Sequence, residues 1–412
     1  MPGVPGSRVL RGKMKADKSK KKAERRERRA LRRHRRFWVL MRILLSRYFI
    51  RKFGYEYDSL ADIEGPYLLL ANHNMELDPA LVGIATHKHV YFVASEHIMR
   101  KGLGTWFLRT FFRPIIHTKG KTGTKSVMAI IKTLKKGQNV CLFAEGNRSF
   151  NGVTGDILPS TGKLAKAAGA SLVTFRIEGG FLTQPRFSTS RRKGKTYGHL
   201  VHVYKPEELK KMSDDEMNEA INRDLYEDAY AVQAEKMIPY KGKNLTLGIE
   251  STLFWCPACK KMETLTSTSD EVRCGACGFT ASYDEYGYLN CSDGVKRNMR
   301  DWDREQKDFL IGQFRNGTFE GFTDPVTVRI IGADHKAGEV MNGELRATTE
   351  GVTFAGKHYK RGYISGLAVY SRNYINTLFG PEEVQYDLRG DRGFNALKYY
   401  YLYQETGKET DS

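Results

Sequence analysis

A histidine and an aspartate lie five positions apart, at His73 and Asp78, in a segment whose neighbours predict a tight connection. The apolar run 67–71 before it predicts a short buried strand, and Pro79 directly after Asp78 predicts the first turn of a helix. With the chain turning between them, Asp78 can accept the Nδ1–H of His73, which leaves Nε2 as a general base. The spacing therefore predicts a catalytic dyad. The alternative is a helix cap at Asp78 beside an ordinary loop histidine, and this segment alone leaves both interpretations open.

A second charged segment, Glu145 to Ser149, also follows an apolar run, here residues 140–144. In layered α/β domains ligands usually bind at the edge where strands end, because helix N-termini and free backbone N–H groups point there. Arg148 has a planar guanidinium suited to binding a phosphate through two hydrogen bonds. The segment therefore predicts an anion-binding group at the end of a second strand.

The two segments together resemble the glycerolipid acyltransferase family, the lysophosphatidate acyltransferase type in particular. That family carries an N-H-x-x-x-x-D motif and, later in the chain, an F-P-E-G-T-R-S motif. This chain carries Asn72-His73 with Asp78, and then Phe143-Ala144-Glu145-Gly146-Asn147-Arg148-Ser149. Ala144 and Asn147 replace the proline and the threonine of the family motif. The resemblance covers roughly residues 65–230.

The resemblance implies an enzyme that moves an acyl group from a thioester, acyl-CoA or acyl carrier protein, to a lysophospholipid. The expected acceptor is 1-acyl-sn-glycerol-3-phosphate, and no organic cofactor beyond the acyl donor is expected. By matching positions, His73 would be the general base and Asp78 its orienting partner. The residues implied to bind the acceptor are Glu145, Gly146 and Arg148, with His117 or Lys119 in place of a further phosphate-binding arginine.

Four of the six cysteines form two Cys-x-x-Cys pairs, Cys256/Cys259 and Cys274/Cys277, with 14 residues between the pairs. This spacing predicts a zinc ribbon over residues 250–282, because two tight turns can offer four thiolates to one ion. Four thiolates leave no open position for a substrate, so the zinc is expected to be structural. A ribbon that binds nucleic acid is the alternative.

The chain is strongly basic, with a net charge of +20, which predicts an anionic partner, either a membrane surface or nucleic acid. Residues 1–36 are expected to form a basic tail or a solvated helix. Residues 37–60 are expected to form an interfacial amphipathic helix, because Arg42, Ser46 and Arg47 cluster on one side of an apolar segment. We expect neither a spanning helix nor a secretory signal, and hence a peripheral protein on the cytoplasmic face of the cell membrane. The alternative is a helix packed on the protein's own core beside a nucleic-acid-binding tail.

The rest of the pattern predicts an α/β acyltransferase domain at residues 61–240 and a mainly β C-terminal domain at residues 293–412. Strands and helices alternate in the first, and a capping box at Ser213 predicts a helix to about Met237. Short strands separated by turn signals predict the C-terminal β domain, with a closing helix at residues 395–403. Several strands closed by one helix resemble pleckstrin-homology-like lipid-binding domains.

Two other functions stay open at this point. A nucleic-acid-binding protein could consist of the basic tail and the ribbon, although it would have no need of the dyad. A degenerate acyltransferase that serves only as a lipid-binding scaffold would fit the changes at Ala144 and Asn147.

Overall fold

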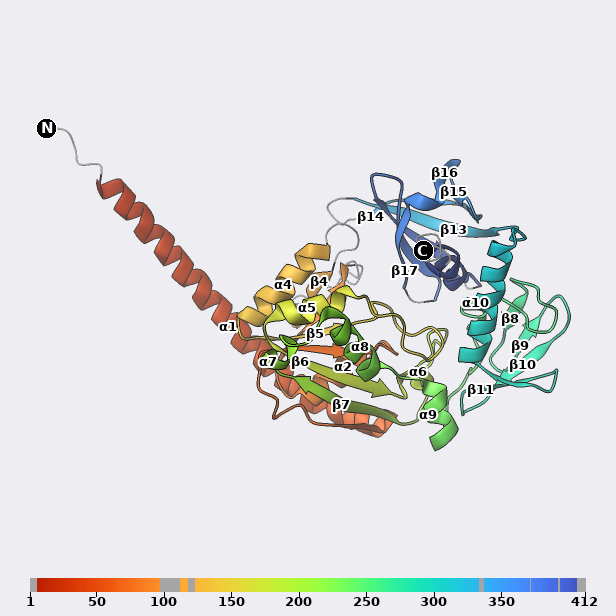
Figure 1. Cartoon of the computed structure of the whole chain (residues 1–412), viewed down its shortest axis with the longest axis horizontal. Coiled ribbons are helices and arrows are strands. Elements are labelled where there is room, and N and C mark those ends of the chain that lie inside the picture. The colour runs from red at the N-terminus through yellow and green to blue at the C-terminus, as the bar shows by residue number, and fades with distance from the viewer. Residues whose placement is uncertain are drawn as a thin grey trace.

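The computed structural model describes residues 6–96, 112–117, 123–332, 337–370, 372–391 and 393–405. A long N-terminal helix projects from one side of an α/β domain, and a small β module and a larger β domain lie on the other side (Figure 1). Within the described ranges, no helix has both the length and the apolar character needed to cross a bilayer.

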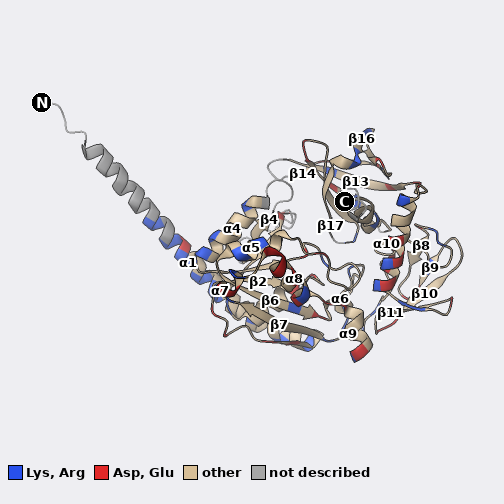
Figure 2. Cartoon of the chain, in the orientation of Figure 1, with Lys and Arg blue, Asp and Glu red and all other residues tan. Residues whose placement is uncertain are grey.

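Helix α1 spans Gly6–Phe53 without interruption, so the basic segment is helical, which is one of the two expected forms, and no boundary separates it from the helix expected to begin at residue 37. Lys, Arg, Leu and Ala are good helix formers, which lets the basic run continue the helix. The helix ends at Phe53 and not at residue 60, because Gly54 takes a φ of +54° and a strand follows. Figure 2 shows Lys and Arg along the described part of this helix.

The C-terminal part of α1 has two different faces. Trp38 and Phe49 are buried against the α/β domain, with exposed fractions of 6% and 2%. This face packs on the protein's own core, as one of the two alternatives predicted. The opposite face exposes six large apolar side chains, namely Val39, Leu40, Ile43, Leu44, Tyr48 and Ile50.

Seven strands form one mixed sheet in the order β1-β7-β6-β2-β5-β3-β4. Their bounds are β1 Tyr55–Tyr57, β2 Tyr67–Ala71, β3 Val90–Ser95, β4 Ile115–His117, β5 Asn139–Phe143, β6 Ser171–Glu178 and β7 Thr196–Tyr204. Strands β6, β2, β5, β3 and β4 are parallel, so their carboxyl ends share one edge of the sheet. All five residues of β2 are buried, as expected for a central strand covered on both faces. Since β1 belongs to this sheet, the expected domain start at residue 61 is too late.

The helices of this domain are α2 Asp78–Thr86, α4 Gly123–Lys135, α5 Ser160–Ala168, α6 Gly180–Thr183, α7 Pro206–Leu209, α8 Asp214–Leu225 and α9 Ala229–Lys236. The capping box at Ser213 forms as predicted. The single helix predicted to reach Met237 is wrong, because the backbone becomes extended at Tyr226. Glu227 then turns into the protein interior, and Asp228 caps α9 by accepting from two backbone N–H groups.

The four cysteines belong to a five-stranded antiparallel module in the order β12-β11-β10-β9-β8. Its strands are β8 Leu265–Ser267, β9 Val272–Cys274, β10 Thr280–Tyr283, β11 Tyr288–Cys291 and β12 Lys296–Asn298. Because β10 pairs with β11, the module continues past the predicted limit at residue 282.

The C-terminal region is mainly β, as predicted, but it begins with a helix that the prediction missed, α10 Met299–Arg315. Seven antiparallel strands follow in the order β16-β15-β14-β13-β19-β18-β17. They are β13 Phe322–Ile331, β14 Ala337–Ala347, β15 Gly351–Phe354, β16 Lys357–Lys360, β17 Ile364–Tyr370, β18 Tyr374–Phe379 and β19 Val384–Gly390. A closing helix forms as α11 Ala396–Tyr400 with a π-helical turn after it. The likeness to pleckstrin-homology-like domains stays a prediction.

Candidate active site

The predicted dyad forms at the carboxyl end of β2. His73 Nδ1 lies 2.8 Å from Asp78 Oδ2. The same oxygen accepts the backbone N–H groups of Asn74 at 2.6 Å and of Met75 at 2.9 Å, so one turn fixes both members of the pair. The cap of α2 is Leu77 and not Asp78, whose side chain serves this turn instead. Asp78 is fully buried, while the His73 side chain stays 21% exposed, and the Asp78 contact at Nδ1 leaves Nε2 to accept a proton.

The second predicted segment lies directly against the first. The His73 ring stacks on Phe143, the last residue of β5, with ring centroids 4.5 Å apart. The backbone N–H of His73 donates to Glu145 Oε1 at 2.5 Å, and its C=O accepts from the N–H of Ser149 at 2.7 Å. The structure thus joins the two segments because β2 and β5 are neighbours in the sheet.

Glu145 is oriented toward the backbone of this turn. Its second oxygen, Oε2, accepts the N–H of Gly155 at 2.6 Å, so both carboxyl oxygens already have donors. Burial raises the pKa of Glu145 to about 8, although the N–H groups of Gly155 and His73 favour the charged form. Glu145 therefore organises the loop around His73, and its predicted contact with the acceptor stays a prediction.

Gly146 and Arg148 complete the second segment. Gly146 takes a φ of +67°, in the left-handed region that favours glycine, and a Cβ there would meet no atom within 4 Å. The backbone conformation at position 146, and not a lack of space for a side chain, therefore favours glycine there. The Arg148 side chain is 11% exposed, and its guanidinium lies 3.8 Å from Glu76 Oε1. Burial lowers the pKa of Arg148 from its usual value, which indicates that the nearby carboxylates only partly offset the cost of burying its charge.

Arg191 joins the same site and was missed by sequence reasoning. Its guanidinium lies 3.9 Å from Glu76 Oε2, and its side chain is 38% exposed. Both contacts of Glu76 are longer than a normal hydrogen bond, so they are loose ion pairs. Arg186 adds a third arginine: it is buried and donates to the backbone C=O of Arg148 at 2.6 Å. The basic run 191–193 was the only sequence signal, and it gave no indication of proximity to His73.

The remaining predicted acceptor residues lie elsewhere. His117 ends β4, and its Nδ1 lies 2.9 Å from Ser126 Oγ. Strand β4 is three positions from β2 in the sheet, which puts roughly 14 Å between the two strands at the usual spacing. His117 thus shares the edge with the dyad without lying beside it. Lys119 lies outside the described residues.

The C-terminal domain packs against this edge of the sheet. Tyr370 Oη lies 2.7 Å from Ser95 Oγ at the end of β3, and Gln385 Nε2 donates to Glu96 Oε1 at 2.8 Å. Arg186 also donates to the backbone C=O of Val369. The carboxyl ends of the strands are therefore bordered by both domains.

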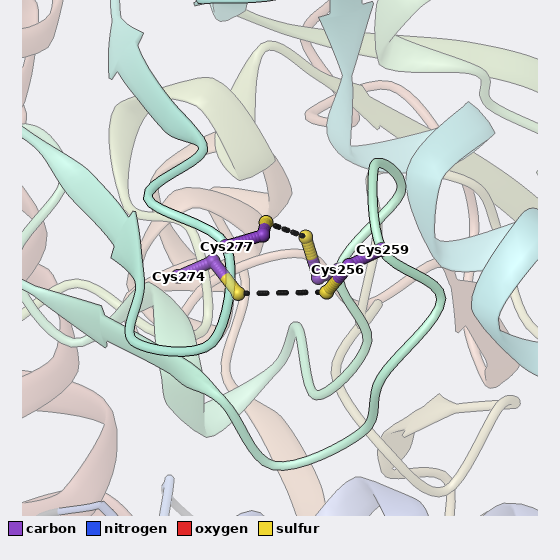
Figure 3. Close-up of side chains that lie close together, drawn as sticks. All are labelled: Cys256, Cys259, Cys274 and Cys277. Carbon is purple, nitrogen blue, oxygen red and sulfur yellow. Dashed lines mark hydrogen bonds between the residues drawn. The ribbon is translucent and has the colours of Figure 1, made fainter.

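The four predicted metal-ligating cysteines come together (Figure 3). All four Sγ atoms lie within 4.8 Å of one another, and the Cys256–Cys277 and Cys259–Cys274 Sγ pairs are each 3.8 Å apart. These separations are far longer than a disulfide bond. Four sulfurs about 2.3 Å from one tetrahedral ion would be about 3.8 Å apart, so the thiols fit a metal site.

Comparisons with known proteins address the α/β domain. No curated protein sequence matches the chain. Among solved structures, the chain is similar to PlsC, the 1-acyl-sn-glycerophosphate (LPA) acyltransferase from Thermotoga maritima, with 19% identity, a TM-score of 0.41, and coverage of 48% of this chain and 79% of that chain. The acyltransferase family model matches residues 50–178, which contain both motifs. Residues 50–178 therefore carry an acyltransferase-family domain, in agreement with the resemblance that the two motifs indicated.

Proposed function

We propose that this protein transfers an acyl group from acyl-CoA or acyl carrier protein to the free hydroxyl of a lysophospholipid, with 1-acyl-sn-glycerol-3-phosphate as the acceptor. The observation that carries the proposal is the contact of 2.8 Å between His73 and Asp78 at the strand edge that also holds Arg148. The family match over residues 50–178 supports the reaction class.

The chemistry of the dyad suits this reaction. An alcohol attacks a thioester slowly unless a base removes its proton as the C–O bond forms, a contribution of about 10²- to 10⁴-fold. His73 Nε2 takes that proton, and Asp78 stabilises the resulting imidazolium. The tetrahedral intermediate then collapses, the C–S bond breaks, and the thiolate leaves with the proton from His73. The products are an ester and a free thiol.

The cluster of arginines supports a phosphate on the acceptor. Arg148 and Arg191 both lie beside Glu76, whose side chain is 53% exposed, at the loose distances of 3.8 and 3.9 Å. Arg191 Nε also donates to Gln184 Oε1 at 3.4 Å, which leaves the NH groups of its guanidinium for a ligand. A phosphate could displace this carboxylate and accept closer, charge-assisted hydrogen bonds from both guanidiniums. A phosphomonoester carries nearly two negative charges and so offsets both cations, while a phosphodiester carries one. This difference favours lysophosphatidate over lysophospholipids with a larger headgroup.

Helix α1 supports a peripheral position on an anionic membrane, which we propose to be the cytoplasmic face of the cell membrane. Its exposed face carries six large apolar side chains, and Lys and Arg line the preceding turns (Figure 2). Apolar burial and about 1 kcal/mol for each surface-bound Lys or Arg would hold such a helix at the interface. A binder of nucleic acid would have no use for the exposed apolar face.

We further propose that the four clustered cysteines hold a structural zinc ion. Four thiolates fill the tetrahedral shell of zinc, which leaves no position for a substrate. Because the strands of this module are three or four residues long, the ion would supply stability that a small core cannot.

The test is acyl transfer to lysophosphatidate in liposomes, with acyl-CoA and acyl carrier protein offered separately. We expect His73→Ala to lose at least about two decades of rate. The matched control is His358→Ala, a histidine of strand β16 in the C-terminal domain, which should keep the wild-type rate. A wild-type protein that binds liposomes but transfers from neither donor would refute the lysophosphatidate assignment.

A further inference from the structure

A buried carboxyl group lies behind the dyad, and the chemistry proposed above makes no use of it. Glu227 follows α8, and only 2% of its surface is exposed. Its Oε2 accepts from Asn74 Nδ2 at 3.1 Å, and the Gly179 backbone also hydrogen-bonds to the carboxyl group. The Asn74 backbone N–H in turn donates to Asp78 Oδ2 at 2.6 Å. Glu227 is therefore linked to His73 through two residues.

The backbone of Glu227 is held as firmly as its side chain. Its C=O accepts the N–H of Thr154, and its own N–H donates to Thr154 Oγ1, both at 2.9 Å. The next residue, Gly155, donates its N–H to Glu145, which accepts from the backbone of His73. One connected network thus fixes Glu227 relative to both motifs of the active site.

Three buried oxygens of this network have no hydrogen-bond partner among the residues that the structure describes. They are Glu227 Oε1, Asn74 Oδ1 and Asp78 Oδ1. The first two belong to the carboxyl and amide groups that already share one hydrogen bond. An ionised carboxylate and an amide oxygen only accept, so they cannot pair with each other. A proton on Glu227 Oε1 would turn that oxygen into a donor, and the acid and the amide could then share two hydrogen bonds.

The surroundings of Glu227 favour the neutral acid. Burial raises the pKa of its carboxyl group well above the usual value, and the charges of Glu178 and Glu145 raise it further, against hydrogen bonds from Asn74 and Gly179. The titratable groups that face it are Glu178 on β6, Glu145 after β5, and the phenol of Tyr240. Two basic side chains nearby contact Glu178 instead, Lys236 at 3.4 Å and the His199 ring at 3.3 Å.

We propose that Glu227 carries a proton at neutral pH, donates it to Asn74 Oδ1, and is thereby a positioning residue for the His73–Asp78 dyad. The doubly bonded pair holds the Asn74 side chain, whose backbone N–H fixes the Asp78 carboxylate. A neutral Glu227 also avoids a second carboxylate charge behind Asp78, so that the Asp78 charge stays directed at Nδ1–H of His73. The catalytic half of the proposal rests on the proposed function, whereas the protonation of Glu227 does not.

The test compares Glu227→Gln with Glu227→Leu in the full-length protein. Glutamine keeps both hydrogen bonds, since its C=O accepts from Asn74 and its NH₂ donates to it. We expect Glu227→Gln to keep kcat within about threefold at neutral pH and to lose the alkaline decline that ionisation of Glu227 causes in the wild type. Glu227→Leu should lose at least about tenfold in kcat with little change in KM, because it removes both Glu227 hydrogen bonds to Asn74 without touching the acceptor site. Asn74 Nδ2 would keep its hydrogen bond of 2.9 Å to the C=O of Ile177, and its Oδ1 would have no donor.

Unfolding measured against pH tests the proton without using activity. A folded state that retains a proton on Glu227 loses stability as the pH rises above the pKa of an ordinary glutamate, and Glu227→Gln should remove that part of the slope. Glu145 is present in both proteins, and Glu145→Gln in both backgrounds separates its titration, which is coupled to that of Glu227, from the slope of Glu227 itself. An unchanged slope in Glu227→Gln, or a Glu227→Gln enzyme as impaired as Glu227→Leu, would overturn the proposal. If neither the wild type nor the variants transfer acyl groups, only the proposed function fails. The slope of unfolding free energy against pH still decides whether Glu227 holds a proton.

Discussion

Replacing Arg191 with glutamine should weaken the use of a phosphate-bearing acceptor and leave the base intact. Arg191 lies 3.9 Å from Glu76 and contacts neither member of the dyad. A hydrogen bond to a charged group contributes about 1.5–3 kcal/mol, which corresponds to roughly 10- to 150-fold in kcat/KM. The Arg191 side chain is 38% exposed and that of Arg148 is 11% exposed, so solvent screens Arg191 more. We therefore expect Arg191→Gln near the lower end of this range and Arg148→Gln near the upper end.

Glu76→Gln should act in the opposite direction. In the free enzyme, Glu76 occupies the space between the two guanidiniums that we assign to the phosphate. Exposed ion pairs of this kind are worth about 0.2–1 kcal/mol, so their removal should lower KM for lysophosphatidate by up to about fivefold. Two neighbouring substitutions with effects of opposite sign are difficult to explain by general damage to the fold.

The assay is kcat/KM for lysophosphatidate and for monoacylglycerol, which lacks the phosphate, in the same liposomes and at constant ionic strength. Arg191→Gln should reduce the ratio of the two values, while Arg273→Gln, an exposed arginine of the β module, should leave it unchanged. An equal loss with both acceptors would refute the reasoning, because the effect would then be independent of the phosphate. So would a Glu76→Gln enzyme with a raised KM.

Three further results are expected. Burial raises the pKa of Glu145 to about 8 from 4.5, so the folded chain retains a proton between these values that the unfolded chain has lost. The free energy of unfolding in urea should therefore fall as the pH rises through this window, by up to about 1.4 kcal/mol per unit, and Glu145→Gln should flatten that decline. Metal analysis of the purified protein should find zinc. Either Cys274→Ser or a chelator should speed amide hydrogen exchange in β8–β12, because the ion would no longer stabilise the module. A zinc-free protein with equally slow exchange in these strands would contradict the structural role. Leu40→Glu with Leu44→Glu should lower binding to anionic vesicles by at least about tenfold, since these leucines are 54% and 56% exposed on α1. Unchanged sedimentation with vesicles would show that this face does not enter the bilayer.

The sequence was most informative where partners are close along the chain. His73 and Asp78 are five residues apart, and a turn after an apolar strand leaves few ways to arrange them, so the dyad could be predicted. The two Cys-x-x-Cys pairs are equally local, and the structure brings them together as predicted. The strands at residues 90–93 and 140–143 also followed from their apolar, β-branched and aromatic composition.

Local patterns failed where burial decided the outcome. The residues from Ser213 to Met237 have a continuous helical pattern, yet the helix ends at Leu225, and the extended backbone at Tyr226 brings the Glu227 carboxyl group into contact with Asn74 in the interior. The amphipathic pattern of α1 did not predict which of its apolar residues the core would cover. Trp38 and Leu40 are both hydrophobic, yet Trp38 is buried and Leu40 is exposed, because only Trp38 faces the α/β domain.

The sequence by itself predicted the acyltransferase domain, the contact between His73 and Asp78, and the cysteine cluster. Only the tertiary structure decided which distant residues complete the site. Asn74 and Glu227 are 153 positions apart, and Arg191 reaches Glu76 from a different loop. Such contacts depend on the strand order of the sheet and on the path of each loop, and no periodicity in the sequence encodes either, because each is set by how the whole chain packs.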